Sequence, residues 1–120
     1  MASTDDRASV GVAESECSVI EDVMGILGRA WAGAVVQAIL DGSERFNDIA
    51  RAVPGVTDGM LSARLRELCA RGLVERAVEP GSPVSVTYRL TQAGRDVAPV
   101  LDAVRVFGQA HPELFAPEAG

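Results

Sequence analysis

The sequence has no lysine, only two cysteines (Cys17 and Cys69) and a single histidine, His111. Two cysteines are too few for a disulfide framework, and free thiols are typical of cytoplasmic proteins. One histidine, and cysteines without metal-ligand spacing, argue against a zinc site. No nucleophile with a neighbouring general base is visible, so we expect no enzymatic activity, no metal and no cofactor.

Long apolar runs are also missing, because no segment approaches the length of a membrane span. The chain begins with MASTDDRASVGVAESE, which is acidic and lacks the positive-then-apolar pattern of a signal peptide. We therefore expect a cytoplasmic protein that does not contact membranes. Its 120 residues are enough for one domain with a core of its own.

The net charge of −6 argues against a nucleic-acid-binding protein that works by bulk attraction. The charge is unevenly distributed, however. Residues 1–27 hold six acidic residues and one arginine, whereas residues 57–76 hold four arginines and three acidic residues. The acidic charge therefore belongs mostly to the beginning of the chain, and the middle is weakly basic.

Residues 1–15 are small, polar and acidic, and we expect a disordered tail there. Ser18 followed by Glu21 is a capping-box pattern that predicts the start of the first helix. Five apolar side chains of that helix are expected to be buried: Val19, Ile20, Val23, Ile26 and Leu27. An apolar helix over residues 30–40 is predicted next, as the central core helix. Its core positions are Ala34, Val35, Ala38 and Ile39.

The stretch TDGMLSARLRELCARG, residues 57–72, predicts the helix around which the rest of the chain is organised. Leu61, Leu65 and Leu68 recur at helical spacing and form one apolar stripe. Thr57 is a good N-cap for this helix, which we place over residues 57–71, and a glycine follows its end.

A shorter helix over residues 44–52, capped by Ser43, is predicted just before it. Pro54-Gly55 separates the two helices. Two helices joined by so short a turn indicate a helix-turn-helix, in which the second helix reads DNA. Four residues turn away from the leucine stripe: Gly59, Ser62, Ala63 and Arg66. This face is smooth, unlike the lysine- and glutamate-rich face of an ordinary solvated helix, and its arginine is long enough to reach phosphates or guanine edges.

After Gly72 the pattern changes to that of β-strands, over residues 73–78 and 84–90. Pro80-Gly81-Ser82-Pro83 predicts the turn between them, so residues 73–90 form a β-hairpin wing. Thr91 is expected to cap the last helix, in which Pro99 predicts a kink or a break. Its apolar positions are Val97, Val100, Leu101, Val104 and Phe107.

The expected fold is therefore mainly α with a β-hairpin wing, a winged helix-turn-helix domain over residues 16–108, followed by a loose tail over residues 109–120. Six strings in this order resemble the HxlR family of winged-helix transcription regulators, which is related to MarR proteins. They are Cys17-Ser18-Val19, Gly28-Arg29-Ala30-Trp31, Arg45-Phe46-Asn47-Asp48-Ile49, Leu61-Ser62-x-Arg64-Leu65-x-x-Leu68, Gly72-Leu73-Val74 and Tyr88-x-Leu90-Thr91-x-x-Gly94.

The resemblance implies a homodimer whose first and last helices form most of the interface. Each helix 57–71 would enter a major groove of a palindromic operator on double-stranded DNA, and each wing 73–90 would lie along the backbone or the minor groove. A small molecule or the state of a thiol would modulate binding. Where the family usually has a glycine-glycine-lysine-tryptophan-threonine string, a proline-lysine pair and a wing arginine, this chain has Gly28-Arg29-Ala30-Trp31-Ala32, Asp58-Gly59 and Ser85. Each change removes a phosphate contact, so we expect weaker DNA binding than in a typical relative.

The residues expected to contact DNA lie on the second helix and the wing. They are Thr57, Gly59, Met60, Ser62, Ala63, Arg64, Arg66, Arg76, Ser82 and Ser85. Three of them have a second interpretation. Arg64 borders the leucine stripe and would equally well brace the turn against Asp48 or Glu67, Thr57 is a cap, and Met60 suits a gap beside the preceding helix.

Cys17 occupies the position of the reactive cysteine in redox-sensing members of the family that this chain resembles. Nearby carboxylates disfavour its thiolate, whereas the start of a helix favours it, so redox sensing and an inert thiol both stand. Cys69 adjoins the leucine stripe and is expected to be a small core residue. Trp31, the only tryptophan, either packs in the core or lines an effector cavity among the small residues that surround it.

Two functions of different classes follow from the sequence. The first is a dimeric DNA-binding transcription regulator. The second is a winged-helix module that has lost DNA binding and regulates through a ligand or a protein partner. The acidic net charge and the three departures from the family pattern favour the second, whereas the smooth helix face favours the first.

Overall fold

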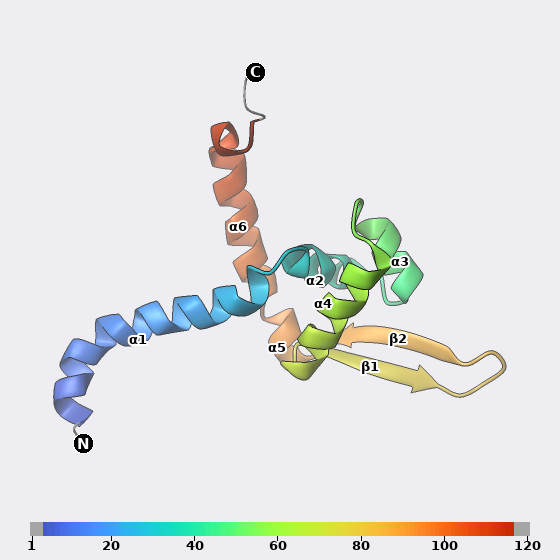
Figure 1. Cartoon of the computed structure of the whole chain (residues 1–120), viewed down its shortest axis with the longest axis horizontal. Coiled ribbons are helices and arrows are strands. Elements are labelled where there is room, and N and C mark those ends of the chain that lie inside the picture. Colours follow the sequence, from blue (N-terminus) through green and yellow to red (C-terminus); the bar gives the residue numbers. More distant parts are fainter. Residues whose placement is uncertain (1–3, 117–120) are drawn as a thin grey trace.

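The computed structural model describes the backbone of residues 4–116 and the side chains of residues 16–116. Helices α2 (Ala32–Leu40), α3 (Phe46–Ala52) and α4 (Asp58–Ala70) form a central body together with the hairpin β1 (Val74–Glu79) and β2 (Ser85–Leu90). Two arms, α1 (Thr4–Leu27) and α6 (Ala98–Ala110), project from this body in different directions (Figure 1). The winged helix-turn-helix fold predicted from the sequence is confirmed.

The core lies between α2, α4 and the base of the hairpin. Val35, Val36, Ile49, Leu61 and Leu68 are all at most 1% exposed. The leucine stripe of α4 is therefore buried as predicted, and α2 is the central core helix. The prediction is wrong at one position, because Ala34 is exposed and Val36 takes the buried place.

The first helix is longer than expected. The start predicted at Ser18 is wrong, because α1 begins at Thr4, within the segment expected to be a disordered tail over residues 1–15, and Ser18 lies inside the helix rather than at its cap. No proline interrupts the segment. Of this expected tail, residues 1–3 lie outside the described part of the chain.

The burial predicted for the first helix is also wrong for a single copy of the chain. Ile26 and Leu27 pack against the core, but Val19, Ile20 and Val23 are 58%, 63% and 39% exposed. The helical spacing of these residues is as expected, yet nothing in the described part of the same chain covers them. The apolar face of α1 is therefore open.

The helix-turn-helix has sharp, locally determined ends. The hydroxyl of Thr57 accepts a hydrogen bond from the backbone N–H of Met60 at 3.1 Å, as expected of the N-cap of α4. Gly72 has φ +85°, which ends the helix in a conformation that favours glycine. Ser43 does not cap α3, since Arg45 occupies the N-cap position without a side-chain hydrogen bond.

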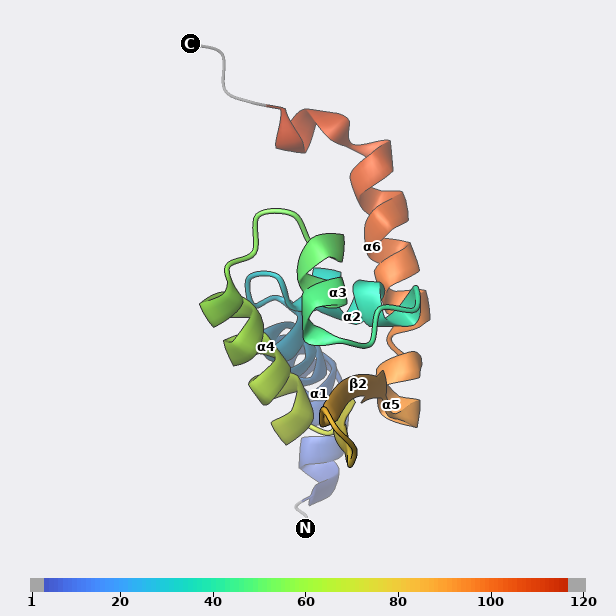
Figure 2. The ribbon, with the colours of Figure 1, turned by 90° about the vertical axis from the view of Figure 1, so that its right-hand side faces the viewer.

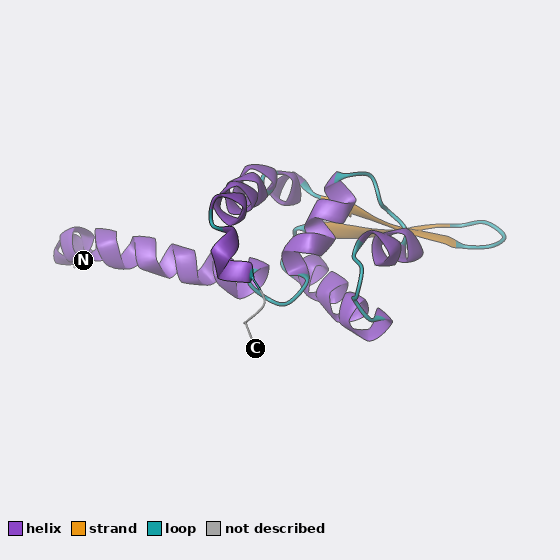
Figure 3. Cartoon of the chain, turned by 90° about the horizontal axis from the view of Figure 1, so that it is seen from above, coloured by secondary structure: helices purple, strands orange, loops and turns teal. Residues whose placement is uncertain are grey.

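The wing is a two-stranded antiparallel sheet in which Val74 pairs with Leu90 and Glu79 pairs with Ser85. Its base packs on the core, and its tip extends away from the body on the side opposite α1 (Figure 3). The backbone N–H of Tyr88 donates to the carbonyl of Glu44 at 2.7 Å, which joins the wing to the segment before α3.

The break predicted at Pro99 is confirmed. The short helix α5 (Gln92–Arg95), capped by Thr91, ends before α6 begins, and Pro99 lies in the first turn of α6, where a missing N–H costs nothing. A loose tail is expected over residues 109–120, and the structure describes part of this segment. Residues 109 and 110 belong to α6, a 3₁₀ helix η1 (Pro112–Phe115) follows, and residues 117–120 lie outside the described part.

Among the described residues, no single helix is long and apolar enough to cross a membrane. Only Glu16–Leu27 and Ala32–Leu40 taken together, with a bend of 75° between them, would meet the requirement of length and composition.

Candidate nucleic-acid interface

Helix α4 lies at the edge of the body, on the side away from α6 (Figure 2). Its leucine stripe faces inward, so the opposite face is directed to solvent. On that face Asp58, Gly59 and Arg66 are exposed, and Ser62 and Ala63 are half-buried. The smooth helix face inferred from the sequence therefore faces outward.

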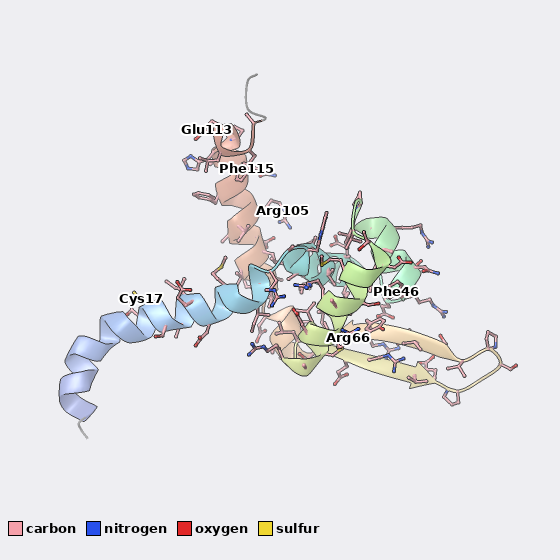
Figure 4. The ribbon with its side chains drawn as sticks, in the orientation of Figure 1. Cys17, Phe46, Arg66, Arg105, Glu113 and Phe115 are labelled. Atoms are coloured by element: carbon pink, nitrogen blue, oxygen red, sulfur yellow. The ribbon has the colours of Figure 1, made fainter. Side chains whose placement is uncertain are left out.

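This face is also open in the steric sense. A Cβ atom placed on Gly59 would meet no heavy atom within 4 Å. Arg66 lies in the half of α4 that leads to the hairpin (Figure 4), and it forms no ion pair with any described residue. A guanidinium that is exposed and unpaired keeps all its donors for an external acceptor.

Arg64 differs from Arg66 both in its exposure and in its ion pairing. Its side chain is only 8% exposed, and its Nη1 lies 3.5 Å from Oε1 of Glu67. Its Nε is buried without a hydrogen-bond partner among the described residues. The interpretation that Arg64 braces the domain through Glu67 therefore fits the structure, whereas a direct contact with DNA would require the side chain to leave its buried position.

The remaining positions on α4 divide between structure and surface. Thr57 is exposed, but its hydroxyl already caps the helix. Met60 is half-buried at the edge of the buried stripe. Gly59 and Ala63 offer no polar group, so their contribution to an interface is close approach rather than hydrogen bonding.

On the wing, Arg76 and Ser82 are exposed, and Arg76 makes no ion pair among the described residues. Ser85 is half-buried, and its buried Oγ has no partner among them. Arg89, which also belongs to the wing, is held by Glu44 at 3.8 Å and Glu79 at 3.7 Å. Arg76 and Ser82 are therefore available to a ligand, and Ser85 is less accessible.

Sequence reasoning missed Arg71, the C-cap residue of α4. It is exposed and unpaired among the described residues, and it lies between Arg66 and Arg76 of the wing in the sequence. The signal was present, because a cation after the last turn of a helix also suits the negative end of its dipole. Together, Arg66, Arg71 and Arg76 give this part of the chain three positive charges that are available to an external anion.

The effector candidates do not belong to this face of α4. Cys17 is exposed on the α1 arm, away from the central body that carries Arg66 (Figure 4). Trp31 is the residue before α2, has φ 72° and is 37% exposed. Cys69 is half-buried on α4, and burial raises the pKa of its thiol, although the positive charge of Arg76 lowers it in part.

A cleft of about 480 Å³ lies between the end of α2, the base of the hairpin and α5. Its lining includes Ile39, Leu40, Glu44, Arg89 and Arg95, but neither Cys17 nor Trp31. Among the described residues, no three histidine, cysteine or carboxylate side chains come together in a way that would hold a metal ion.

Comparisons with known proteins agree with this geometry. The profile of the HxlR-like helix-turn-helix family matches residues 26–114. The uncharacterised HTH-type transcriptional regulator YvaP of Bacillus subtilis (strain 168) is 39% identical over 88 residues, which cover 73% of this chain and 82% of YvaP. The HTH-type transcriptional regulator YodB of the same strain is 34% identical over 91 residues, or 76% of this chain and 81% of YodB. The solved structure of the redox regulator HypR in its reduced form superposes with a TM-score of 0.73 at 33% identity, covering 80% of this chain and 95% of that one.

Proposed function

The chain belongs to the HxlR-like helix-turn-helix family of transcriptional regulators, and we propose that it is a cytoplasmic homodimer that binds a palindromic operator on double-stranded DNA. In this proposal α4 enters the major groove of each half-site, and the wing, residues 73–90, lies along the backbone or the minor groove. The observation that carries it is the open face of α4, where Gly59 leaves room for close approach and Arg66 is exposed and unpaired among the described residues.

The chemistry of this face suits DNA in two ways. Arg66 would form a bidentate pair with a guanine edge, which discriminates against the wrong base by about 1–3 kcal/mol. Arg71 and Arg76 follow it in the chain and would contact phosphates, which fix the register without reading the sequence. Arg64 is a brace for α4 in this proposal and not a DNA contact, because it is buried against Glu67.

Dimerisation is supported by the two arms. On α1, Val19 and Ile20 are exposed, and on α6, Val104 and Phe107 are 60% and 56% exposed. Single exposed apolar residues are ordinary, but residues grouped along two helices mark an interaction surface. A two-fold dimer would cover the same patch on both copies and would present two α4 helices to two symmetric half-sites.

We also propose that a thiol or a small molecule modulates the dimer. The similar solved structures include diamide-treated YodB and HypR in its oxidised form. In this chain Cys17 is exposed on α1, so its oxidation would add a bulky or polar group to a dimer arm. For a small molecule, Trp31 is the reporter, because a metabolite bound beside it would quench its fluorescence. A flat titration with candidate metabolites would remove that option.

The second candidate function, a winged-helix module without DNA binding, has its own support. The net charge is −6, Arg64 is withdrawn from the surface, and Asp58 sits at the start of α4 where an anionic backbone would approach. Such a module would use its exposed faces for a ligand or a protein partner.

A mobility-shift assay on the DNA upstream of its own gene separates the two functions, with an unrelated fragment of equal length as the reference. The DNA-binding proposal predicts tighter binding to the upstream fragment, a linear fall of log affinity with log salt, and a loss of discrimination in Arg66→Ala. Equal and weak binding of wild type and Arg66→Ala to both fragments would favour the second function.

A further inference from the structure

Glu67 of α4 lies between two arginines from different parts of the chain. Its Oε1 faces Nη1 of Arg64 at 3.5 Å, and its Oε2 faces Nη2 of Arg29 at 3.4 Å. Arg64 belongs to α4 itself, whereas Arg29 belongs to the connection between α1 and α2. One carboxylate therefore joins the buried brace of α4 to the base of the α1 arm.

The same connection touches the helix-turn-helix at a second point. Trp31 adopts φ 72°, a conformation that costs free energy in a residue other than glycine and that the surroundings must hold in place. A Cβ atom placed on Gly55, in the turn between α3 and α4, would lie only 3.3 Å from Cη2 of the Trp31 ring. Trp31 therefore rests on the turn before α4, and Arg29 reaches the last part of the same helix.

The connection is also tightly turned where it leaves α1. The N–H of Gly28 donates to the carbonyl of Met24 at 2.8 Å, and a Cβ atom at Gly28 would come within 2.5 Å of that oxygen. Only glycine fits such a turn without a shift of the backbone. With Gly28 at one end and contacts to α4 at the other, this short connection gives the α1 arm a route to α4 in addition to the packing of Ile26 and Leu27 on the core.

We propose that Arg29 is a positioning residue, which ties the α1–α2 connection to α4 through Glu67. Through this tie the orientation of the α1 arm sets the orientation of α4. The proposal rests on the proposed function, because it assigns to Arg29 an effect on how α4 reads DNA. Arg29 and Glu67 are 53% and 42% exposed, so their ion pair contributes little to the stability of the fold. Its role in this proposal is to set the angle of α4 relative to the α1 arm.

Arg29→Gln removes the tie and leaves the pair between Arg64 and Glu67 intact. The variant removes one exposed ion pair from each copy of the proposed dimer. We therefore expect the ratio of affinity for the upstream fragment to affinity for an unrelated fragment to fall about fivefold, as for the loss of two such pairs. The slope of log affinity against log salt should stay unchanged. If Arg29 instead bound a phosphate, removing that charge would lower the slope by about one unit for each phosphate it neutralises, which would overturn the proposal.

The fluorescence of Trp31, the only tryptophan, gives a readout that needs no DNA. Quenching by acrylamide should increase in Arg29→Gln, because the connection is released, and Arg29→Lys should restore both the quenching and the affinity ratio. The matched control is Arg105→Gln, which carries the same charge change and breaks a bridge between α6 and α2 but none to α4. That variant should leave the quenching at the wild-type value.

The two readouts separate the proposals. If wild type does not discriminate between the fragments while quenching increases in Arg29→Gln, the proposed function fails and the tie stands. Unchanged quenching in Arg29→Gln overturns the tie whatever the DNA result. Increased quenching with an unchanged affinity ratio, in a protein that does discriminate, overturns the link between the tie and DNA reading.

Discussion

Apolar side chains are buried in the central body and exposed on the two arms. In the body, Val36 and Leu61 are completely buried, whereas on the arms Ile20 and Val104 are 63% and 60% exposed. One pair of arginines also differs, since Arg66 on the face of α4 is unpaired among the described residues, whereas Arg105 of α6 is bound to Asp102 and Gln37. The body is therefore complete as a single chain and offers a polar surface outward, whereas the arms are apolar surfaces that require cover.

The largest effect is expected in the body. Leu65→Ala, at a position only 2% exposed, should lower the free energy of unfolding by about 2–5 kcal/mol, because it removes a core side chain and leaves a cavity. Chemical denaturation followed by circular dichroism measures this loss. A cost of a few tenths of a kcal/mol would show that the stripe of α4 contributes little to the core, and the contrast with the arms would weaken.

The next effect compares a valine on an arm with an equally exposed valine on the body. Val104→Glu on α6 and Val84→Glu at the wing tip both replace a valine that is 60% exposed. The arm variant should raise the dimer dissociation constant about 100-fold or more, because the new charge would be buried between copies. The wing variant should leave it unchanged. Sedimentation at a series of protein concentrations distinguishes them, and equal behaviour of both variants would contradict a dimer through the arms.

Two arginines two residues apart on α4 are expected to have different roles, one in DNA binding and one in stability. Arg66→Ala should cost about 1–3 kcal/mol in discrimination between operator and unrelated DNA while leaving the melting temperature near that of wild type. Arg64→Ala should instead lower the melting temperature, since it leaves the buried end of the pair with Glu67 empty. Both variants are measured in the same two assays. Thermal melts test the loss of stability expected for Arg64→Ala, and mobility shifts test the loss of discrimination expected for Arg66→Ala. The reverse assignment would mean that Arg64 is the residue that contacts DNA.

The smallest effect concerns the two thiols, one on an arm and one in the body. Cys17 is exposed and should react with a disulfide reagent at pH 8 well before Cys69, whose pKa is raised by burial above its ordinary value of 9.0. A raised pKa means that folding favours the neutral thiol. The stability that this gives is fully present below pH 9.0 and is lost as pH rises through the folded-state value.

The measurement for this last pair is the time course of thiol release, with Cys17→Ser and Cys69→Ala to assign the phases. Slow reaction of Cys17 in the dimer, at a rate equal to that of Cys69, would show that the arm interface covers it. It would then be no sensor of an external oxidant.

Much of the body could be predicted from the sequence because its signals are local. The hydroxyl of Thr57 and the glycine at position 72 each act within one helical turn of α4, which begins and ends near them. The proline at position 99 acts in the same local way at the start of the α6 arm. The leucine stripe of α4 needs only helical periodicity. The same local logic places the start of the first helix at Ser18, which is wrong because a capping pattern does not stop a helix that is already formed upstream.

The rest depends on contacts between distant residues, which periodicity does not contain. The helical spacing of Ile20 is that of a buried residue, yet its side chain is 63% exposed in the single chain. Arg64 stands next to Leu65 at the edge of the stripe, so only the position of Glu67 decides between brace and contact. The pair between Arg29 and Glu67 joins residues that are far apart in the sequence, and nothing near either residue indicates it.

The central claim is that the arms pair two copies so that their α4 helices match successive major grooves. A distance measurement between spin labels on Arg66→Cys, in a chain that also carries Cys17→Ser and Cys69→Ala, tests this directly. Such a dimer should give a single distribution centred at about 30–40 Å, near one helical turn of DNA. A distance far outside that range, or no dipolar interaction in a protein that is dimeric, would contradict it.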